Sequence, residues 1–402
     1  MSRRRVLFLD TPFAHEAGGD KNRSRFLWSA LQAQGGVDWA CIRPHPPGSP
    51  LVPKPLEGGV VPVVELPANP GRGLQSESVL AFTPAAQAAF DRTLADGGYD
   101  LVLARFHAPW ELCRQAATHA ARPAVAVDLD MVSSRLVALA WRQEPTFRRR
   151  WFLFEKWKLE RLERRLLEQP WLVWFSNAAE LEAVAARVPG RRRRAVTAEL
   201  PNVMPASAPL RDLPREPVIL FFGSLNSSAN LDAFRYLMDD LFPRLEADLR
   251  RHGVTIRVVG KNPPAWFAER VRAAGAGRIE LAGAVDSMER AIAAARFVFL
   301  PLRVASGTRT RILEAAAQER AVVTTTIGAE GIDVGDGARV RDTPEALADA
   351  VRELLAEPAL ADRLGQKLHA RCVARYTPDA VAGKLAADLD RFLVKHAPEG
   401  GA

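Results

Sequence analysis

The residues around a predicted helix start at 307–314 have the types and spacing that an anionic ligand requires. The segment Phe297–Ala317 reads FVFLPLRVASGTRTRILEAAA, in which an apolar strand is followed by a polar loop and a helix. The first turn of a helix has unpaired N–H groups and the positive end of the helix dipole. Arg309 and Arg311 add positive charge there, which opposes the dipole unless an anion binds. Gly307 lets the backbone approach that anion closely. We therefore predict an anion site, with a diphosphate as the obvious ligand.

Glu314 lies about one turn into this helix, on the face that it shares with Gly307, Thr310 and Ala317. A carboxylate there would accept hydrogen bonds from two adjacent hydroxyls, such as those of a ribose. The alternative is an exposed glutamate on an ordinary amphipathic helix. The run Ala315–Ala317 favours the ribose hypothesis because it lets the helix pack closely under a sheet.

Two carboxylates, Asp128 and Asp130, follow the apolar run of Ala124–Val127. Polar groups just past a buried strand point to the ligand-binding edge of a parallel sheet. Either carboxylate would accept the proton of a reacting hydroxyl or stabilise a cationic sugar transition state. The alternative is that both cap the next helix. We favour function, with Asp130 ahead of Asp128.

Glycines and a lysine in other loops are weaker candidates. Gly18 and Gly19 follow the first apolar run and would admit a ligand to the backbone, although they are also typical of an ordinary turn. Lys261 follows a strand in VVGKNPP, where it either faces an anion or is simply solvated.

Short apolar runs alternate with helical stretches in both halves of the chain. Continuous runs of this kind suit strands that are buried on both faces of a parallel sheet. We predict helices at Arg23–Gln34, Glu77–Leu94 and Phe147–Glu168, among others. The predicted strands are Val6–Leu9, Trp39–Ile42, Val60–Val64, Leu101–Ala104, Ala124–Val127, Leu172–Phe175, Val218–Phe222, Ile256–Val259, Ile279–Leu281, Phe297–Leu300, Ala321–Thr324 and Ala338–Val340.

This alternation of strands and helices predicts two Rossmann-like, doubly wound α/β lobes that face a cleft. The segment between the two lobes is rich in proline, which excludes both the interior of a helix and a central strand there. Its prolines are Pro201, Pro205, Pro209, Pro214 and Pro217. We expect an N-terminal, acceptor-side domain over residues 1–200, a linker over 201–217 and a nucleotide-sugar-binding domain over 218–376. A helix and tail over 377–402 would be free to pack back on the first lobe.

Composition limits the protein class. The chain has 402 residues, of which 48% are hydrophobic and 25% charged, so two lobes can each bury a core. No apolar run approaches the ~18 residues of a membrane span. Three cysteines lie far apart, which indicates a reducing compartment and a cytoplasmic location. The net charge of +8 comes partly from the clusters 148–150 and 191–194, which suit solvated surface as well as an anionic partner.

The segment Thr146–Glu168 is basic and aromatic, reading TFRRRWFLFEKWKLERLERRLLE. Aromatic residues beside arginines suit the surface of an anionic membrane. They also suit a core helix whose arginines extend to solvent, which is the more common case. A peripheral contact with the inner membrane face is thus one hypothesis. No nucleic-acid-binding module is recognisable, and we expect no nucleic-acid partner.

The sequence resembles the retaining glycosyltransferases of the "group 1" family, which have the GT-B fold. The resemblance rests on SGTRTRILEAAAQERAVVTTTIGAEGI, on FFGSL at 221–225, and on LPN at Leu200–Asn202. It implies that Glu314 binds the donor ribose and that Gly307 and Thr308 contact the donor diphosphate through backbone N–H groups. It also implies that the loops bearing Gly18, Gly19, Gly223, Ser224 and Lys261 border the donor.

Two positions depart from the family pattern. Ser306 stands where many members have a second glutamate, and the loop Gly223–Asn230 reads GSLNSSAN without the usual basic pair. The diphosphate charge would then be met by Arg309, Arg311 or Lys261. The resemblance implies no metal, since helix ends and basic side chains meet the leaving diphosphate in this family.

We therefore predict a hexosyltransferase-like enzyme that moves a sugar from a nucleotide-diphosphate donor, with retention. The acceptor would be a glycan, a lipid-linked or a small molecule, as in polysaccharide biosynthesis. No cofactor is expected beyond the nucleotide-sugar substrate. The alternatives are a nucleotide-sugar epimerase or hydrolase, or a non-catalytic, degenerate scaffold of the same fold.

Overall fold

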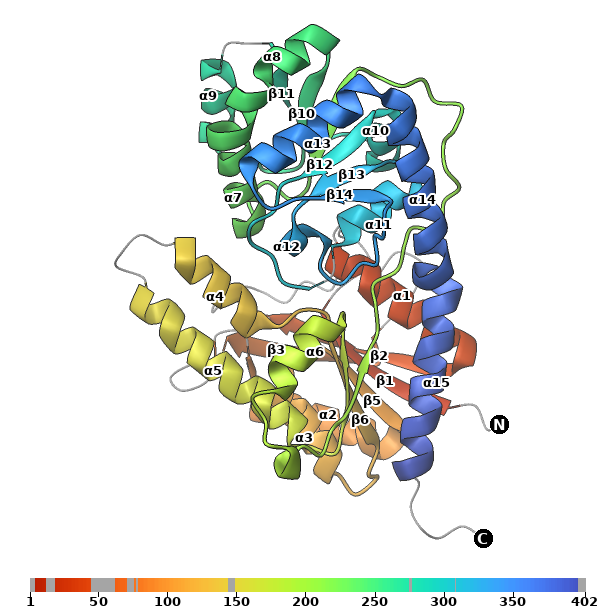
Figure 1. Ribbon diagram of the computed structural model, residues 1–402. Helices are drawn as coiled ribbons and strands as arrows, with labels where there is room; N and C mark the ends of the chain where they lie inside the picture. Colours follow the sequence, from red (N-terminus) through yellow and green to blue (C-terminus); the bar gives the residue numbers. More distant parts are fainter. Residues whose placement is uncertain are drawn as a thin grey trace. The chain divides into compact units, whose positions relative to one another are not determined.

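The computed structural model describes residues 4–11, 19–44, 62–70, 76, 79–143, 149–274, 277–307 and 309–396. The chain divides into two compact units (Figure 1). The first comprises Met1–Asn202 and Val381–Ala402, and the second comprises Val203–Ala380. Each unit has its own hydrophobic core built on its own sheet, so each provides an independent scaffold for a site.

The first unit contains an eight-stranded sheet in the order β4-β3-β2-β1-β5-β6-β7-β8. All neighbouring strands are parallel except β3 and β4, which pair antiparallel. The strands β5 and β7 are buried along their whole length, as their apolar runs predicted, and in β5 the burial includes the terminal Arg105. The strands are β1 (Arg4–Asp10), β2 (Gly35–Pro44), β3 (Val64–Pro70), β4 (Leu80–Phe82), β5 (Leu101–Arg105), β6 (Ala124–Leu129), β7 (Leu172–Phe175) and β8 (Val196–Glu199).

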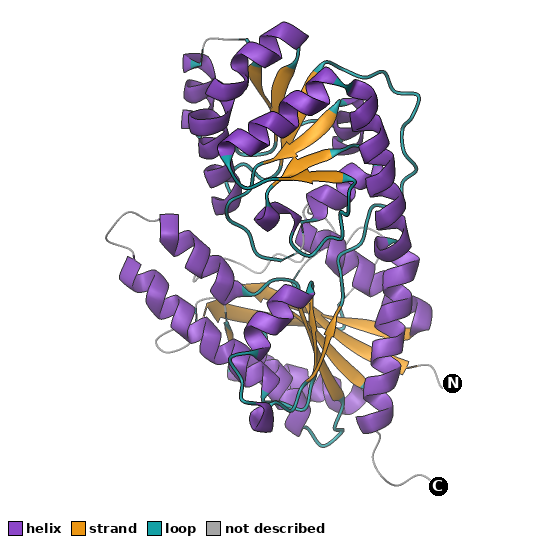
Figure 2. Ribbon diagram, viewed as in Figure 1, coloured by secondary structure: helices purple, strands orange, loops and turns teal. Residues whose placement is uncertain are grey.

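Helices pack along this sheet (Figure 2). The predicted helix Glu77–Leu94 is wrong at its start, because β4 occupies part of that range. Thr83 instead caps the helix by accepting a hydrogen bond from the Ala86 N–H at 3.2 Å, and Pro84 follows at the first helical position. The helices are α1 (Gly19–Gln34), α2 (Pro84–Gly97), α3 (Trp110–Thr118), α4 (Ser133–Gln143), α5 (Arg149–Leu167), α6 (Ala178–Ala185) and the 3₁₀ helix η1 (Gly190–Arg192).

The C-terminal helix α15 (Pro378–His396) returns to the first unit from Val381 onward. The Nε1 of Trp174 in β7 donates a hydrogen bond of 3.0 Å to Oδ2 of Asp388, and Arg4 in β1 forms an ion pair with Asp390. These contacts join the two ends of the chain on one sheet.

The second unit contains a six-stranded, fully parallel sheet in the order β11-β10-β9-β12-β13-β14. Every residue of β9 and β12 is buried, which explains their uninterrupted apolar sequences. The strands are β9 (Val218–Phe222), β10 (Thr255–Val259), β11 (Ile279–Gly283), β12 (Phe297–Leu300), β13 (Val322–Thr324) and β14 (Ala338–Val340).

The helices of the second unit follow its strands, as in a doubly wound fold. They are α7 (Ser228–Tyr236), the π-helix η2 (Leu237–Leu241), α8 (Phe242–His252), α9 (Ala265–Ala273), α10 (Met288–Ala294), α11 (Thr310–Ala317), α12 (Thr326–Ala329), α13 (Pro344–Ala356) and α14 (Pro358–Tyr376).

The proline-rich segment forms neither helix nor strand, as its prolines dictate. It packs on the second unit from Val203 onward: the Met204 N–H donates to the Tyr376 carbonyl at 2.7 Å, and the Leu210 N–H donates to Gln318 Oε1 at 2.9 Å. Cys41, Cys113 and Cys372 are buried and unbridged. None of the described helices has both the length and the apolar character that crossing a membrane requires.

Candidate functional site

The second unit has a topological switch point between β9 and β12. From β9 the chain continues to β10 and β11 on one side of the sheet, whereas β12, β13 and β14 lie on the other. Open parallel sheets bind ligands outside the carboxyl ends of their strands at such a point. The loop Gly223–Ser227 and the loop that precedes α11 both follow strands at this position.

Arg311 of α11 lies across the carboxyl end of β9. Its Nη1 donates hydrogen bonds to the Phe222 carbonyl at 2.8 Å and to Asn230 Oδ1 at 2.7 Å. The next residue, Gly223, has a φ of +149°, and a Cβ there would lie 2.9 Å from the Arg311 Nη1. Arg311 thus brings a guanidinium to the loop that has no basic residue of its own. Burial lowers the pKa of Arg311 to about 10, so the group remains cationic at neutral pH.

Glu314 lies on the same helix as Arg311 and is partly buried. Burial raises the pKa of its carboxyl group, and this effect is opposed by the charge of Arg311 and a hydrogen bond with Thr310. A half-buried carboxylate at the edge of a switch point is suited to accept hydrogen bonds from a ligand that covers it.

The loop before α11 turns at Gly307, whose φ of +76° lies in the left-handed region. Ser306 is buried, and so is Arg309, whose Nη1 donates to the Ser306 carbonyl. The guanidinium of Arg309 is therefore directed at its own loop, in contrast to that of Arg311. Thr308 lies outside the described residues.

The loops after β9 and β10 contact each other through their glycines. A Cβ on Gly260 would lie 1.9 Å from the Gly223 carbonyl oxygen, so these backbones touch. The Leu225 N–H donates to the Lys261 carbonyl at 3.3 Å. Ser224 and Lys261 are both exposed beside this contact. The structure thus brings Gly223, Ser224, Lys261 and Arg311 to one edge of the sheet.

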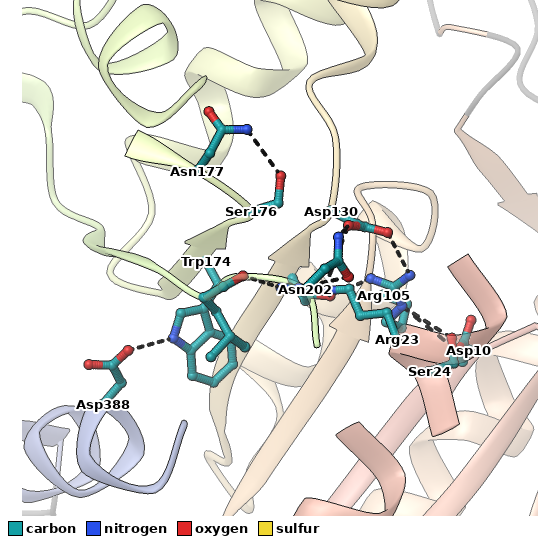
Figure 3. Close-up of polar contacts among 12 residues, drawn as sticks. Asp10, Arg23, Ser24, Arg105, Asp130, Trp174, Ser176, Asn177, Asn202 and Asp388 are labelled. Carbon is teal, nitrogen blue, oxygen red and sulfur yellow. Dashed lines mark hydrogen bonds and ion pairs between the residues drawn. The ribbon is translucent and has the colours of Figure 1, made fainter. Parts of the chain in front are cut away.

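The first unit has its own switch point, between β1 and β5. Polar side chains at the carboxyl ends of adjacent strands meet there (Figure 3): Asp10 ends β1, Arg105 ends β5, and Asp130 follows β6. Arg105 Nε lies 4.0 Å from Asp10 Oδ2 and donates to Ser24 Oγ at 3.3 Å.

Asp128 is the fully buried centre of this cluster. Arg23 donates to it from both Nε, at 2.8 Å, and Nη2, and Arg105 donates from Nη1. Burial alone would raise the pKa of Asp128, but the two guanidinium groups outweigh it and hold that pKa below its usual value. Both oxygens of Asp128 are engaged by arginines and the residue is 0% exposed, which suits an anchor of the cluster, while its catalytic role stays a prediction.

Asp130 is held less tightly than Asp128. Its Oδ1 accepts a hydrogen bond of 2.8 Å from Asn202 Nδ2, and its Oδ2 lies 3.5 Å from Arg105 Nη2. Asn202 Oδ1 in turn accepts from Arg23 Nη1 at 3.3 Å. At the start of α4, the Ser134 N–H donates to Glu163 at 2.9 Å and not to either aspartate.

The backbone beyond β5 is strained next to a buried imidazole. Phe106 has a φ of +58°, which is unusual for a residue with a bulky side chain. His107 follows it and is 3% exposed, and within the described part of the chain neither of its ring nitrogens has a hydrogen-bond partner. Burial lowers the pKa of His107 to about 4, so the ring is neutral at pH 7.

The sequence prediction did not single out Arg23, Arg105 or Asn202 as site residues. Arg105 could have been found, because it ends the fully buried run LVLAR, where a charged side chain needs a partner. Asn202 stands in the LPN motif, but its link to Asp130 depends on tertiary structure. Gly19 opens α1, and Gly18 lies outside the described residues.

Metal ligands are not clustered in the resolved parts of either unit. Among the described residues, no group of three or more His, Cys, Asp or Glu side chains could hold a metal ion.

Comparisons with known proteins identify the second unit directly. Residues 216–357 match the family model of the glycosyl transferases group 1. No curated protein sequence matches the chain.

Several solved structures share the fold across both units. Sucrose-phosphate synthase from Thermosynechococcus elongatus has a TM-score of 0.69 at 20% identity, over 98% of this chain and 100% of that chain. A glycosyltransferase from Rickettsia africae has a TM-score of 0.67 at 13% identity, over 98% and 99%. HepE of Anabaena in complex with UDP and glucose has a TM-score of 0.65 at 14% identity, over 97% and 100%.

The family match covers the strands and helices that form the second switch point, and the fold matches extend over both units. The chain therefore has the two-unit GT-B fold, and its residues 216–357 match the family model of the glycosyl transferases group 1.

Proposed function

We propose that the second unit binds a nucleoside-diphosphate sugar at the β9/β12 switch point. The observation that carries the proposal is the position of Arg311, which places a cation beside Gly223 in a loop without basic residues. The diphosphate would lie between Arg311 and the backbone N–H groups at Gly307, where the left-handed turn leads into α11. Lys261 is exposed on the adjacent loop and would add a second charge.

Glu314 would bind the ribose of the donor. Its carboxylate lies one turn beyond the start of α11, so a nucleotide whose diphosphate sits at that start presents its ribose to the same helix face. HepE, which shares the fold, was solved with UDP and glucose, so UDP and UDP-glucose are the first compounds to test.

The acceptor would bind at the β1/β5 switch point of the first unit. There Asp130 is positioned by Asn202, and its side chain is 9% exposed. In the transfer, the acceptor oxygen bonds to the anomeric carbon as the bond from that carbon to the diphosphate breaks. The acceptor proton passes to a base, and Asp130 would take that proton or stabilise the positive charge of the transition state.

Further features of the reaction are part of the same proposal. We propose transfer of a hexose with retention, without a metal ion, and in the cytoplasm, with a glycan, lipid-linked or small acceptor. Arg311 and the N–H groups of α11 would stabilise the leaving diphosphate electrostatically. Turnover in excess chelator should be undiminished, whereas loss that magnesium or manganese restores would rule out metal independence.

Glu314→Ala tests the donor site. Calorimetry should show UDP affinity about tenfold lower or more, since hydrogen bonds to charged groups contribute about 1.5–3 kcal/mol. With 2′-deoxy-UDP, the difference in affinity between Glu314→Ala and the unaltered protein should be smaller, because this ligand lacks a hydroxyl that would donate to Glu314.

Glu353→Ala is the matched control, since it removes an exposed carboxylate of the same unit that pairs with Arg339. Equal UDP affinity in Glu314→Ala and the unaltered protein would contradict the proposal. Release of free UDP from UDP-sugars without acceptor, at the rate seen with acceptor, would identify a hydrolase.

A further inference from the structure

Helix α5 exposes an unusual set of large apolar side chains in its first turns. Trp151, Leu153, Phe154 and Trp157 are 45%, 49%, 44% and 46% exposed, respectively. The other exposed large apolar residues of the described chain are valines scattered over it, at Val63, Val196, Val373 and Val394. The rings of Phe154 and Trp157 stack at 5.9 Å, one helical turn apart. Clustered exposed apolar groups of this kind mark an interaction surface.

Arginines extend the same helix face toward its C-terminal end. Positions 150, 154, 157, 161, 164 and 165 follow the spacing of three and four residues that places side chains on one side of a helix. Arg150, Arg164 and Arg165 are exposed, and the guanidinium of Arg161 lies 5.7 Å from the Trp157 ring centroid. We call this set, together with Trp151 and Leu153, the α5 face.

The acidic residues of α5 each have a hydrogen-bond or ion-pair partner within the first unit. Glu155 is buried and accepts hydrogen bonds from Ser76 and Lys158, at 2.9 and 2.6 Å. Glu163 is buried and accepts from the Ser134 backbone at 2.9 Å. Glu160 pairs with Lys156 at 2.6 Å. Glu160 borders the α5 face but its charge is paired with Lys156, so the charge of the face is predominantly positive.

Positive charge is further concentrated around Arg165. Partial desolvation lowers the pKa of Arg165, and the nearby charges of Arg161, Arg114 and Arg164 lower it as well, against the opposing charge of Glu168. Arg114 comes from the neighbouring helix α3 and is exposed. Like charges repel one another, so a surface rich in anions would reduce the electrostatic repulsion among these arginines.

We propose that the α5 face binds the surface of a membrane that contains anionic phospholipids. Trp and Phe side chains concentrate at the membrane interface, where their rings enter the boundary between headgroups and acyl chains. The arginines would meet lipid phosphates at the same depth, because their stems cover apolar surface while their heads reach outward. The α5 face is predominantly positive and aromatic, so both its charge and its rings are suited to an anionic lipid surface.

Cosedimentation of the full-length protein with vesicles tests this proposal. The protein should pellet with vesicles of phosphatidylcholine and phosphatidylglycerol and remain in solution with phosphatidylcholine alone. Arg164→Gln combined with Arg165→Gln should weaken binding more than tenfold, at about fivefold for each arginine. Phe154→Ser combined with Trp157→Ser should weaken it by a similar or larger factor, because the rings are lost from the interface.

Arg250→Gln combined with Arg251→Gln is the matched control, since it removes two exposed arginines from α8 of the second unit. This variant should bind vesicles nearly as well as the unaltered protein. Trp157→Phe keeps the aromatic character, so it should still bind while quenching of tryptophan fluorescence by brominated lipid decreases. That signal reports insertion independently of any effect on folding.

Three outcomes would overturn the proposal: equal binding to both vesicle types, equal losses in the α8 and α5 arginine variants, or no change in quenching. A single-stranded oligonucleotide that binds as tightly as anionic vesicles, with the same dependence on Phe154 and Trp157, would instead assign the face to nucleic acid. None of these measurements depends on sugar transfer, so they are independent of the donor proposal.

Discussion

The guanidinium of Arg311 is bound to the last residue of β9, because its Nη1 donates a hydrogen bond of 2.8 Å to the Phe222 carbonyl oxygen. Arg311 comes from a helix that follows β12, so the contact joins the two strands that flank the switch point of the sheet. Arg311 thus supplies the positive charge that the loop after β9 lacks, although it belongs to another segment of the chain.

Arg311→Gln should weaken UDP binding about tenfold to a hundredfold, because a charge-assisted contact contributes about 1.5–3 kcal/mol. The loss should be much smaller for uridine, which has no phosphate. Isothermal calorimetry measures both. Arg339→Gln, which removes a half-buried arginine paired with Glu353, should leave UDP affinity unchanged. An equal loss for uridine and UDP would show that Arg311 does not meet the diphosphate.

Gly223→Ala should displace Arg311 and weaken UDP binding. The added Cβ would lie 2.7 Å from Asn230 Nδ2 and 2.9 Å from Arg311 Nη1, at a φ of +149°. Strain of this kind costs about 1–3 kcal/mol. Gly253→Ala is the control, because its φ is +63° but nothing lies within 4 Å of the new Cβ. Thermal unfolding should detect strain in both variants, whereas calorimetry should detect weaker UDP binding only in Gly223→Ala.

Asp128→Asn should destabilise the first unit by about 3–5 kcal/mol, because it leaves Arg23 and Arg105 buried without their carboxylate. Asp130→Asn should be much milder for stability, since its strongest bond is to an uncharged amide, while it should reduce the rate of transfer. Urea unfolding and steady-state kinetics separate the two roles. Similar stability for both variants would contradict the assignment of Asp128 as the anchor of the cluster.

His107 should make the stability of the first unit depend on pH. Its folded pKa of about 4 lies below the ordinary histidine value of about 6.5, so between these values the unfolded chain binds a proton that the folded chain does not. The contribution of neutral His107 to the free energy of unfolding is therefore fully present above about pH 6.5. As the pH falls toward 4, about 3 kcal/mol of this free energy is lost. Urea unfolding of His107→Leu should show a flatter pH profile over this window. Identical slopes for both proteins would show that His107 is not buried in a neutral state.

Strand positions were predicted from the sequence because buried parallel strands have nearly continuous apolar residues. The predicted strands Leu101–Ala104, Val218–Phe222 and Phe297–Leu300 agree with β5, β9 and β12 to within one residue. The strand β4 was missed because it is short and lies just before a helix start, where an apolar run is equally compatible with helix. The helix α4 was also missed, since its start is satisfied by Glu163 of α5, a partner that is distant in sequence.

The sequence by itself determined the α/β class and the helix start with Gly307, Arg311 and Glu314, because local spacing fixes which side chains share a helix face. Only the tertiary structure decided which charges are available for chemistry. It placed Arg311 on the end of β9, and it buried Asp128 between Arg23 and Arg105 while leaving Asp130 less constrained. The reason is physical: the state of a charged side chain depends on its burial and on partners from distant strands and helices, and neither can be read from neighbouring residues.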